Sequence, residues 1–318
     1  MRSWKEDFRL GVVHYAAFPE AEGASWMRSF CHVLGDEDYE AIEITTNFDP
    51  SLPPAIASLV RATGLRLALS GGAIFFREGW DLSSVDSEIR QRAIGRVNEM
   101  IKSAGALGAD AVLFFSGPDV EMERRAQARD AFRASLETLL EYRNQLLSAR
   151  SPQLHIEIFD RDLTLRRLLG PSRESAHFIQ SVKREGGSVG ITVDLSHIHQ
   201  QGETPDRTLS ELGETLVHVH LSNCVIDDPT DPLYGDKHPP FGWPGSRVGR
   251  NELGTFLQAL DQSGFSKRPF RGERPILSLE VKPPPGMDPY AILTQAKADL
   301  VGAWEAFVRE EPRDSASR

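Results

Sequence analysis

Cysteine and positive charge are both scarce in this chain of 318 residues. Only two cysteines are present, Cys31 and Cys224, too few for the disulfide framework of a small secreted protein, so we expect a reducing, cytoplasmic environment. Lysine and arginine together number 36 against 46 acidic residues, which gives a net charge of −10. Surfaces that bind nucleic acids are basic, so this balance argues against a nucleic-acid partner.

Long apolar runs and a glycine-rich phosphate turn are also missing. The opening residues MRSWKEDFRL lack the apolar core of a signal peptide, and no run approaches the ~20 residues of a membrane-spanning helix. We therefore expect no membrane partner. The segment LGVVHYAAFPE (10–20) has no glycine-rich turn, although such a turn normally follows the first strand of a dinucleotide-binding open sheet.

Short apolar segments alternate with longer segments of helical period, which is typical of α/β proteins with parallel strands. Eight such pairs favour a (β/α)8 TIM barrel over an open sheet. We predict a single domain over residues 1–318, with a frayed tail at 310–318. The predicted strands are 10–14, 41–45, 65–69, 111–115, 154–159, 190–195, 216–221 and 276–281, and the predicted helices lie around 24–34, 52–63, 86–106, 124–149, 172–185, 206–214, 250–262 and 291–309.

The strand VHVHLSN (217–223) places apolar residues on one face and His218, His220 and Ser222 on the other, because strand side chains alternate. Three other late strands share this pattern. Their aliphatic faces must pack against helices, so the polar faces point into the barrel, near the end where barrel enzymes hold their active sites. The further polar residues of these strands are His155, Glu157, Thr192, Asp194, Ser278, Glu280 and Lys282.

Three of these residues are carboxylates, Glu157, Asp194 and Glu280, which converge on one axis with Lys282 as the only fixed cation nearby. Each uncompensated charge taken out of water is costly, and a bound divalent cation resolves the clash more directly than protonation does. Three carboxylates and the imidazole of His220 suit Mn²⁺ first, then Mg²⁺ and Co²⁺. Zn²⁺ remains an alternative that normally prefers more nitrogen or sulfur ligands.

Four motifs, IEIFDRD, DLSH, HVHLSN and LEVKP, resemble those of the xylose-isomerase-like TIM barrels. That superfamily includes keto-sugar 3-epimerases, hydroxypyruvate isomerases, inosose dehydratases and repair enzymes of the endonuclease IV type. The resemblance implies that Glu157, Asp194, His220 and Glu280 are the metal ligands. It also implies that Glu157 and Glu280 act as the acid/base pair and that His197 binds a substrate hydroxyl.

Several other polar residues have two interpretations. His218 either contacts substrate or orients one of the acids from deeper in the barrel. His238 and Asp236 lie in a loop (234–245) that either covers the barrel mouth or is a rigid surface loop. In that loop Phe241 or Trp243 could wall the pocket. Lys282 is expected to contact substrate. Each of the remaining histidine and glutamate candidates either lines the site or has a structural role; these are His14, Glu43 and His155. Arg166 and Arg167 either clamp an anion or begin a helix.

These features predict a metal-dependent isomerase or epimerase of a keto-sugar or related hydroxy-ketone, which removes the proton beside a metal-bound carbonyl. The alternative is a lyase or dehydratase with the same chemistry, including the catalytic subunit of a C-glycoside deglycosidase with a small β-protein partner. A non-catalytic sugar-binding barrel is a third hypothesis, which the presence of both glutamates opposes. A homo-oligomer is expected, and the sequence does not identify the sugar.

Overall fold

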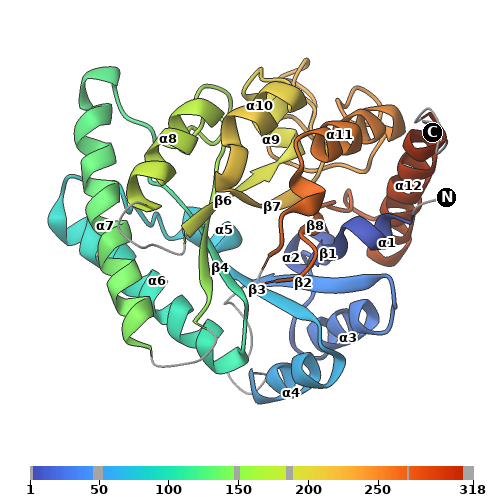
Figure 1. Cartoon of the computed structure of the whole chain (residues 1–318), viewed down its shortest axis with the longest axis horizontal. Helices are drawn as coiled ribbons and strands as arrows, with labels where there is room; N and C mark the ends of the chain where they lie inside the picture. Colours follow the sequence, from blue (N-terminus) through green and yellow to red (C-terminus); the bar gives the residue numbers. More distant parts are fainter. Residues whose placement is uncertain (1–2, 46–52, 147–150, 184–188, 271, 311–318) are drawn as a thin grey trace, which may run out of the picture.

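Eight parallel strands close into a barrel in chain order, and β1 pairs with both β2 and β8 (Figure 1). The computed structural model describes residues 3–45, 53–146, 151–183, 189–270 and 272–310. The architecture confirms the predicted (β/α)8 TIM barrel. The strands are β1 (Arg9–Val13), β2 (Tyr39–Thr45), β3 (Arg66–Ser70), β4 (Ala111–Phe115), β5 (Gln153–Glu157), β6 (Val189–Asp194), β7 (Leu216–Leu221) and β8 (Ile276–Leu279).

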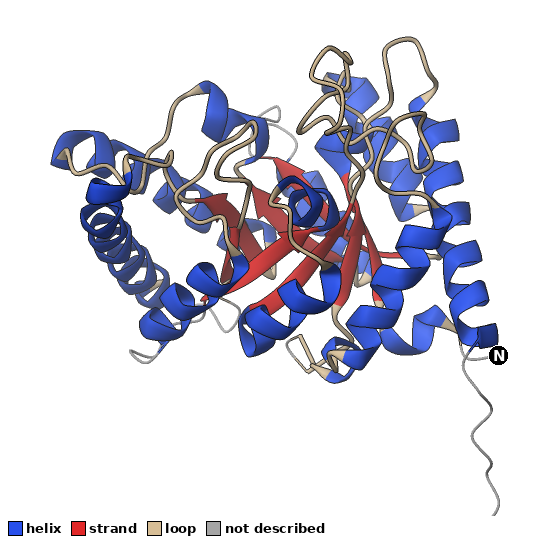
Figure 2. Cartoon of the chain, turned by 90° about the horizontal axis from the view of Figure 1, so that it is seen from above, coloured by secondary structure: helices blue, strands red, loops and turns tan. Residues whose placement is uncertain are grey.

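Helices surround the strands, and long loops gather along one side of the barrel (Figure 2). All eight predicted helices are present: α3 (Gly23–Leu34), α4 (Pro53–Thr63), α6 (Ser87–Leu107), α7 (Arg125–Gln145), α8 (Ser172–Lys183), α10 (Pro205–Leu212), α11 (Arg250–Gln262) and α12 (Pro289–Glu310). The sequence patterns did not predict the short helices: α1 (Trp4–Asp7), α2 (His14–Ala17), α5 (Gly72–Arg77), α9 (Leu195–Gln200) and the 3₁₀ turns η1 (Met122–Arg124), η2 (Gly213–Thr215) and η3 (Phe265–Lys267).

Some predicted boundaries lie outside the described residues: the helix start at 52, the helix ends at 149 and 185, and most of the tail. Several described boundaries differ by one or two residues: the predicted strands 154–159 and 276–281, for example, end at Glu157 and Leu279. Glu280 still keeps the strand register, since its backbone N–H donates to the carbonyl of Leu221 at 2.9 Å. Among the described helices, none is long and apolar enough to cross a membrane.

The two ends of the barrel differ in what fills them. At the N-terminal end, Ala41, Ala111, Phe270 and Ile276 form a small apolar cluster. Ion pairs ring this end, among them Arg66 with Asp110 at 3.2 Å and Arg274 with Glu40 at 2.8 Å. Asp110 therefore lies at the bottom of the barrel. The acids Glu157, Asp194 and Glu280 lie at the opposite, C-terminal end, where β5, β6 and β8 finish.

Candidate metal centre and active site

Four buried side chains meet at the C-terminal end of the barrel: Glu157, Asp194, His220 and Glu280. Glu157 and Asp194 end β5 and β6, His220 lies in β7, and Glu280 directly follows β8. One ligand atom from each lies within 4.8 Å of the others. The structure thus brings together all four residues that the sequence predicts as metal ligands.

Several atoms of this quartet are buried without a hydrogen-bond partner among the described residues: Asp194 Oδ2, His220 Nδ1 and Glu280 Oε2. His220 Nδ1 lies 2.8 Å from Glu280 Oε2 and 3.3 Å from Glu157 Oε1, yet these approaches do not have hydrogen-bond geometry. Unsatisfied buried polar atoms are rare because each one is costly. A divalent cation held by these atoms would satisfy them, so the residues fit a metal site.

The charges of the quartet support the same conclusion. Burial raises the pKa of Glu157 and of Glu280 to about 7 each, although the nearby His220 opposes the shift. Burial lowers the pKa of His220, but Glu43, Glu280 and Glu157 outweigh it and hold the pKa well above its ordinary value. Without a cation, protons must therefore balance the acids near neutral pH, and a divalent cation can take their place.

The local chain path explains how Asp194 can serve two purposes. Asp194 caps α9: its Oδ1 accepts a hydrogen bond from the backbone N–H of Ser196 at 2.6 Å and another from the hydroxyl of Ser222. Its Oδ2 is buried and has no hydrogen-bond partner in the part of the chain that the structure describes. One carboxylate oxygen thus begins the helix while the other is free for a cation.

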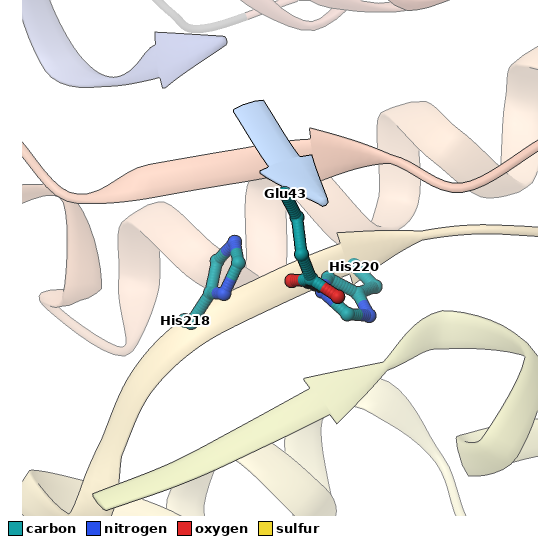
Figure 3. A group of neighbouring side chains, drawn as sticks. All are labelled: Glu43, His218 and His220. Carbon is teal, nitrogen blue, oxygen red and sulfur yellow. Dashed lines mark hydrogen bonds and ion pairs between the residues drawn. The ribbon is translucent and has the colours of Figure 1, made fainter. Parts of the chain in front are cut away.

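His220 is supported from across the barrel by Glu43 of β2 (Figure 3). His220 Nε2 donates to Glu43 Oε2 at 3.1 Å, and the hydroxyl of Tyr15 donates to Glu43 Oε1 at 3.0 Å. Burial raises the pKa of Glu43, but His220 outweighs it, so the pKa lies below its ordinary value and the carboxylate is ionised. A hydrogen bond of this kind orients a metal-ligating imidazole and leaves its other nitrogen facing the acids.

Glu43, His218 and His220 form a second group of potential ligand atoms, drawn in Figure 3. Its atoms are already partnered: His218 Nε2 lies 2.8 Å from the hydroxyl of Ser278, and Glu43 holds His220. We therefore assign no metal to this group. His218 is not among the described residues that line the cavity at the barrel mouth, so we do not propose a substrate contact for it.

Replacing Glu43 by glutamine should weaken Mn²⁺ binding by roughly ten- to a hundredfold, because the ligand His220 loses a charged hydrogen-bond partner. Isothermal titration of the metal-free protein measures this affinity. The matched control is Glu40→Gln on the same strand, because Glu40 pairs with Arg274 at the other end of the barrel and should leave the affinity unchanged. Equal Mn²⁺ affinity in Glu43→Gln and the parent protein would show that His220 needs no such support.

A cavity of about 350 Å³ opens above the quartet. Glu157 and Glu280 form part of its floor, and Phe76, Phe115 and Phe159 are among its apolar walls. The predicted substrate-binding residues His197, His238 and Lys282 also line it. Arg77, which the sequence interpretation missed, adds a second cation at this mouth.

His197 lies in the first turn of α9, the helix that begins directly after Asp194. Its Nδ1 is 3.3 Å from the side-chain oxygen of Gln200, and its Nε2 lies 3.7 Å from both Glu157 Oε1 and Asp236 Oδ1. The DLSH motif thus contributes Asp194 to the quartet and places His197 beside the quartet in the cavity.

His238 is held rigidly in the loop that follows β7. The amide of Asn223 donates to the carbonyl of Pro240 and the hydroxyl of Ser246, both at 2.8 Å, and the backbone of His238 has a positive φ of 46°. Its Nε2 lies 3.0 Å from Asp236 Oδ1 and 3.8 Å from Glu280 Oε1. Burial lowers the pKa of His238, but Asp236 and Glu280 outweigh it and raise the pKa to about 10.

Other residues with two interpretations have structural roles. Phe241 and Trp243 are not among the described residues that line the cavity, so the hypothesis that they wall it is wrong. His14 begins α2 and packs against Trp26, with its Nε2 2.9 Å from the hydroxyl of Ser29. His155 lies near the apolar floor, with its ring 5.6 Å from that of Phe270.

The segment 159–170 forms no helix, so the interpretation of Arg166 and Arg167 as a helix start is wrong. The chain becomes helical only at Ser172, where α8 begins. Arg166 is exposed with a positive φ of 47°. Arg167 is buried, and its guanidinium lies over the ring of Phe76 at 4.3 Å. Its contact therefore supports an aromatic wall of the cavity.

The chain belongs to the xylose isomerase-like TIM barrel family, whose model matches residues 32–290. No curated protein matches it by sequence. Solved structures share the fold: a D-tagatose 3-epimerase-like protein has a TM-score of 0.70 at 16% identity, covering 96% of this chain and 100% of its own. A 3-keto-D-glucoside 4-epimerase from E. coli has a TM-score of 0.64 at 15% identity, with 92% and 98% covered. The IOLI protein with a bound zinc atom has a TM-score of 0.68 at 16% identity, with 94% and 99% covered.

Proposed function

We propose that this protein is a divalent-metal-dependent isomerase or epimerase that acts on a keto-sugar or a related hydroxy-ketone. The observation that carries the proposal is the buried quartet with three unsatisfied ligand atoms, which lies directly under an open cavity. Similarly folded proteins include a D-tagatose 3-epimerase-like protein and a 3-keto-D-glucoside 4-epimerase, which supports the same reaction class. The oxygen-rich ligand set favours Mn²⁺ among the divalent cations.

Glu157 and Glu280 are the proposed acid and base. When bound, a divalent cation would polarise the substrate carbonyl and make the proton on the neighbouring carbon easier to remove. The two glutamates approach His220 Nδ1 from the ends of β5 and β8, at 3.3 Å and 2.8 Å, and both line the cavity. One carboxylate can take a proton from the substrate and the other can return a proton to it.

The cavity residues would hold the sugar in place for this transfer. His197 and His238 offer ring N–H groups to substrate oxygens, and the pKa of about 10 keeps His238 protonated at neutral pH. Lys282 is exposed at the rim, where its ammonium can reach a hydroxyl. The phenylalanine walls limit water around the reacting carbons and provide apolar contact for the sugar's C–H faces.

The test is solvent proton exchange with Mn²⁺-loaded protein in D₂O. Offered a panel of ketohexoses and keto-glycosides, the protein should incorporate deuterium at the carbon beside the carbonyl of its substrate, detected by NMR. An epimerised or isomerised sugar supports the proposal. Release of a fragment or water would instead identify a lyase or dehydratase. Absence of both exchange and conversion across the panel would overturn the proposed function.

A further inference from the structure

A second cavity, of about 480 Å³, adjoins the mouth of the barrel. Its walls come from the turn between α2 and α3 and from the segment between β8 and α12. Pro19 lines both cavities, and Lys282 of the first cavity is followed directly in the chain by Pro283 of the second. The two cavities therefore adjoin at Pro19 and at the Lys282–Pro283 step of the chain.

Prolines and other apolar residues make up most of the lining of the second cavity. We call it the proline groove and define it by Phe18, Pro283, Pro284, Pro285, Met287 and Tyr290. Met287 and Tyr290 are 44% and 36% exposed, two of the few large hydrophobic side chains that the described surface leaves open. The ring of Tyr290 packs 5.1 Å from that of Phe18. Exposed apolar side chains gathered in one groove mark a binding surface.

The charges of the proline groove restrict what it can bind. Glu20 and Asp288 are its charged lining residues, and no lysine or arginine is among the described residues that line it. A phosphate or carboxylate would meet like charge there with no cation to pair with. The groove therefore suits an uncharged, apolar group.

The proline groove is also preorganised. The backbone N–H of Lys282 donates to the carbonyl of His238 at 2.7 Å, which ties the start of the segment to the loop over the metal centre. The N–H of Met287 donates to the carbonyl of Pro284 at 3.1 Å, and Gly286 supplies the positive φ of 81° that this turn requires. A rigid wall loses little entropy when a flat ring packs against it.

We propose that the substrate is a glycoside with an uncharged aromatic aglycone, and that the aglycone occupies the proline groove while the sugar lies over the metal centre. This inference rests on the proposed function, because it places a hydroxy-ketone in the sugar ring. A ketone on a ring carbon other than the anomeric carbon leaves the glycosidic bond intact. The bond can then lead from the first cavity to the second past Pro19.

The test compares the binding of methyl and phenyl β-D-glucoside, which have no ketone and cannot react, to the Mn²⁺-loaded protein by isothermal titration. The phenyl glucoside should bind at least about tenfold more tightly, because its ring buries apolar area that the methyl group lacks. The double variant Met287→Ser/Tyr290→Ser should reduce this ratio to within about twofold while the methyl glucoside binds as before. Met122→Ser is the matched control, since Met122 is a 71% exposed methionine in η1, outside both cavities.

Equal affinity for the two glucosides, or a preference that survives the double variant, would overturn the inference. A second contrary outcome is measured by light scattering. If the parent is a dimer, the double variant is a monomer and the preference for the phenyl glucoside is unchanged, the groove is a contact between copies of the chain and the inference is overturned. The proposed function fails separately, through absence of deuterium exchange with every ketone offered. A retained phenyl preference without exchange would leave the groove as an aglycone site and remove only the reaction.

Discussion

Replacing Glu280 by glutamine should lower the turnover number of the metal-saturated enzyme by about a thousandfold, within the range that positioned acid–base groups contribute. Glutamine keeps the shape of the side chain but cannot take a proton, so KM should change much less than kcat. Glu157→Gln should have a similar effect, because the reaction needs one group to remove the proton and another to return it. Steady-state kinetics with the sugar identified by deuterium exchange give both constants.

Both glutamates are also proposed metal ligands, so the experiment must separate lost chemistry from lost metal. Asp194→Asn is the matched control, because Asp194 is a ligand without an acid–base role in the proposed reaction. Raising the Mn²⁺ concentration should restore much of the activity of Asp194→Asn but little of that of Glu280→Gln. Near-parent activity in both glutamine variants at saturating Mn²⁺ would refute the assignment of the acid/base pair.

The fold was predictable because each barrel strand must bury a full face. The aliphatic residues of β5 to β8 alternate with polar ones, and this period of two is visible in a single sequence. The eight longer helices could be predicted because their apolar residues recur at helical spacing. The short helices α2, α5 and α9 could not, because each is too brief to show a period and directly follows a strand.

The metal quartet was also predictable from alternation. Glu157, Asp194, His220 and Glu280 lie on inward faces near the ends of adjacent strands, so barrel closure alone brings them together. Their roles remain proposals. The hydrogen bond between Glu43 and His220 could not be predicted from the sequence. The two residues are 177 positions apart in the chain, and only the diameter of the closed barrel decides that they touch.

Loop contributions were the least predictable part of the site. Tyr15 follows the predicted end of the first strand, and the turn into α2 carries its hydroxyl to Glu43 while His14 packs away from the cavity. Arg77 and the proline groove likewise depend on the path of loops, for which the sequence has no periodic signal. The proposed substrate contacts therefore need the three-dimensional structure, whereas the proposed metal ligands do not.

Removing the divalent cation should lower the melting temperature of the protein by several degrees. A ligand present at 100 times its Kd stabilises the native state by about 2.7 kcal/mol. In domains somewhat smaller than this one, each kcal/mol of stability changes the melting temperature by roughly 2–4 °C. In this protein the affinity for the cation would come in part from Asp194 Oδ2, His220 Nδ1 and Glu280 Oε2, which have no hydrogen-bond partner among the described residues. Differential scanning calorimetry with EDTA and then with added Mn²⁺ measures the loss and its recovery.

The location of the cation is tested with Asp194→Asn. Asparagine keeps an oxygen that can accept the hydrogen bond from Ser196 and so preserves the start of α9, but it removes a charge from the quartet. The melting temperature of this variant should respond little to EDTA or to a Mn²⁺ concentration that just saturates the parent, and elemental analysis at that concentration should find about one cation per chain only in the parent. A variant that still responds fully would place the cation elsewhere. A parent protein that holds no cation and melts identically in EDTA and Mn²⁺ would show that protons alone balance these acids.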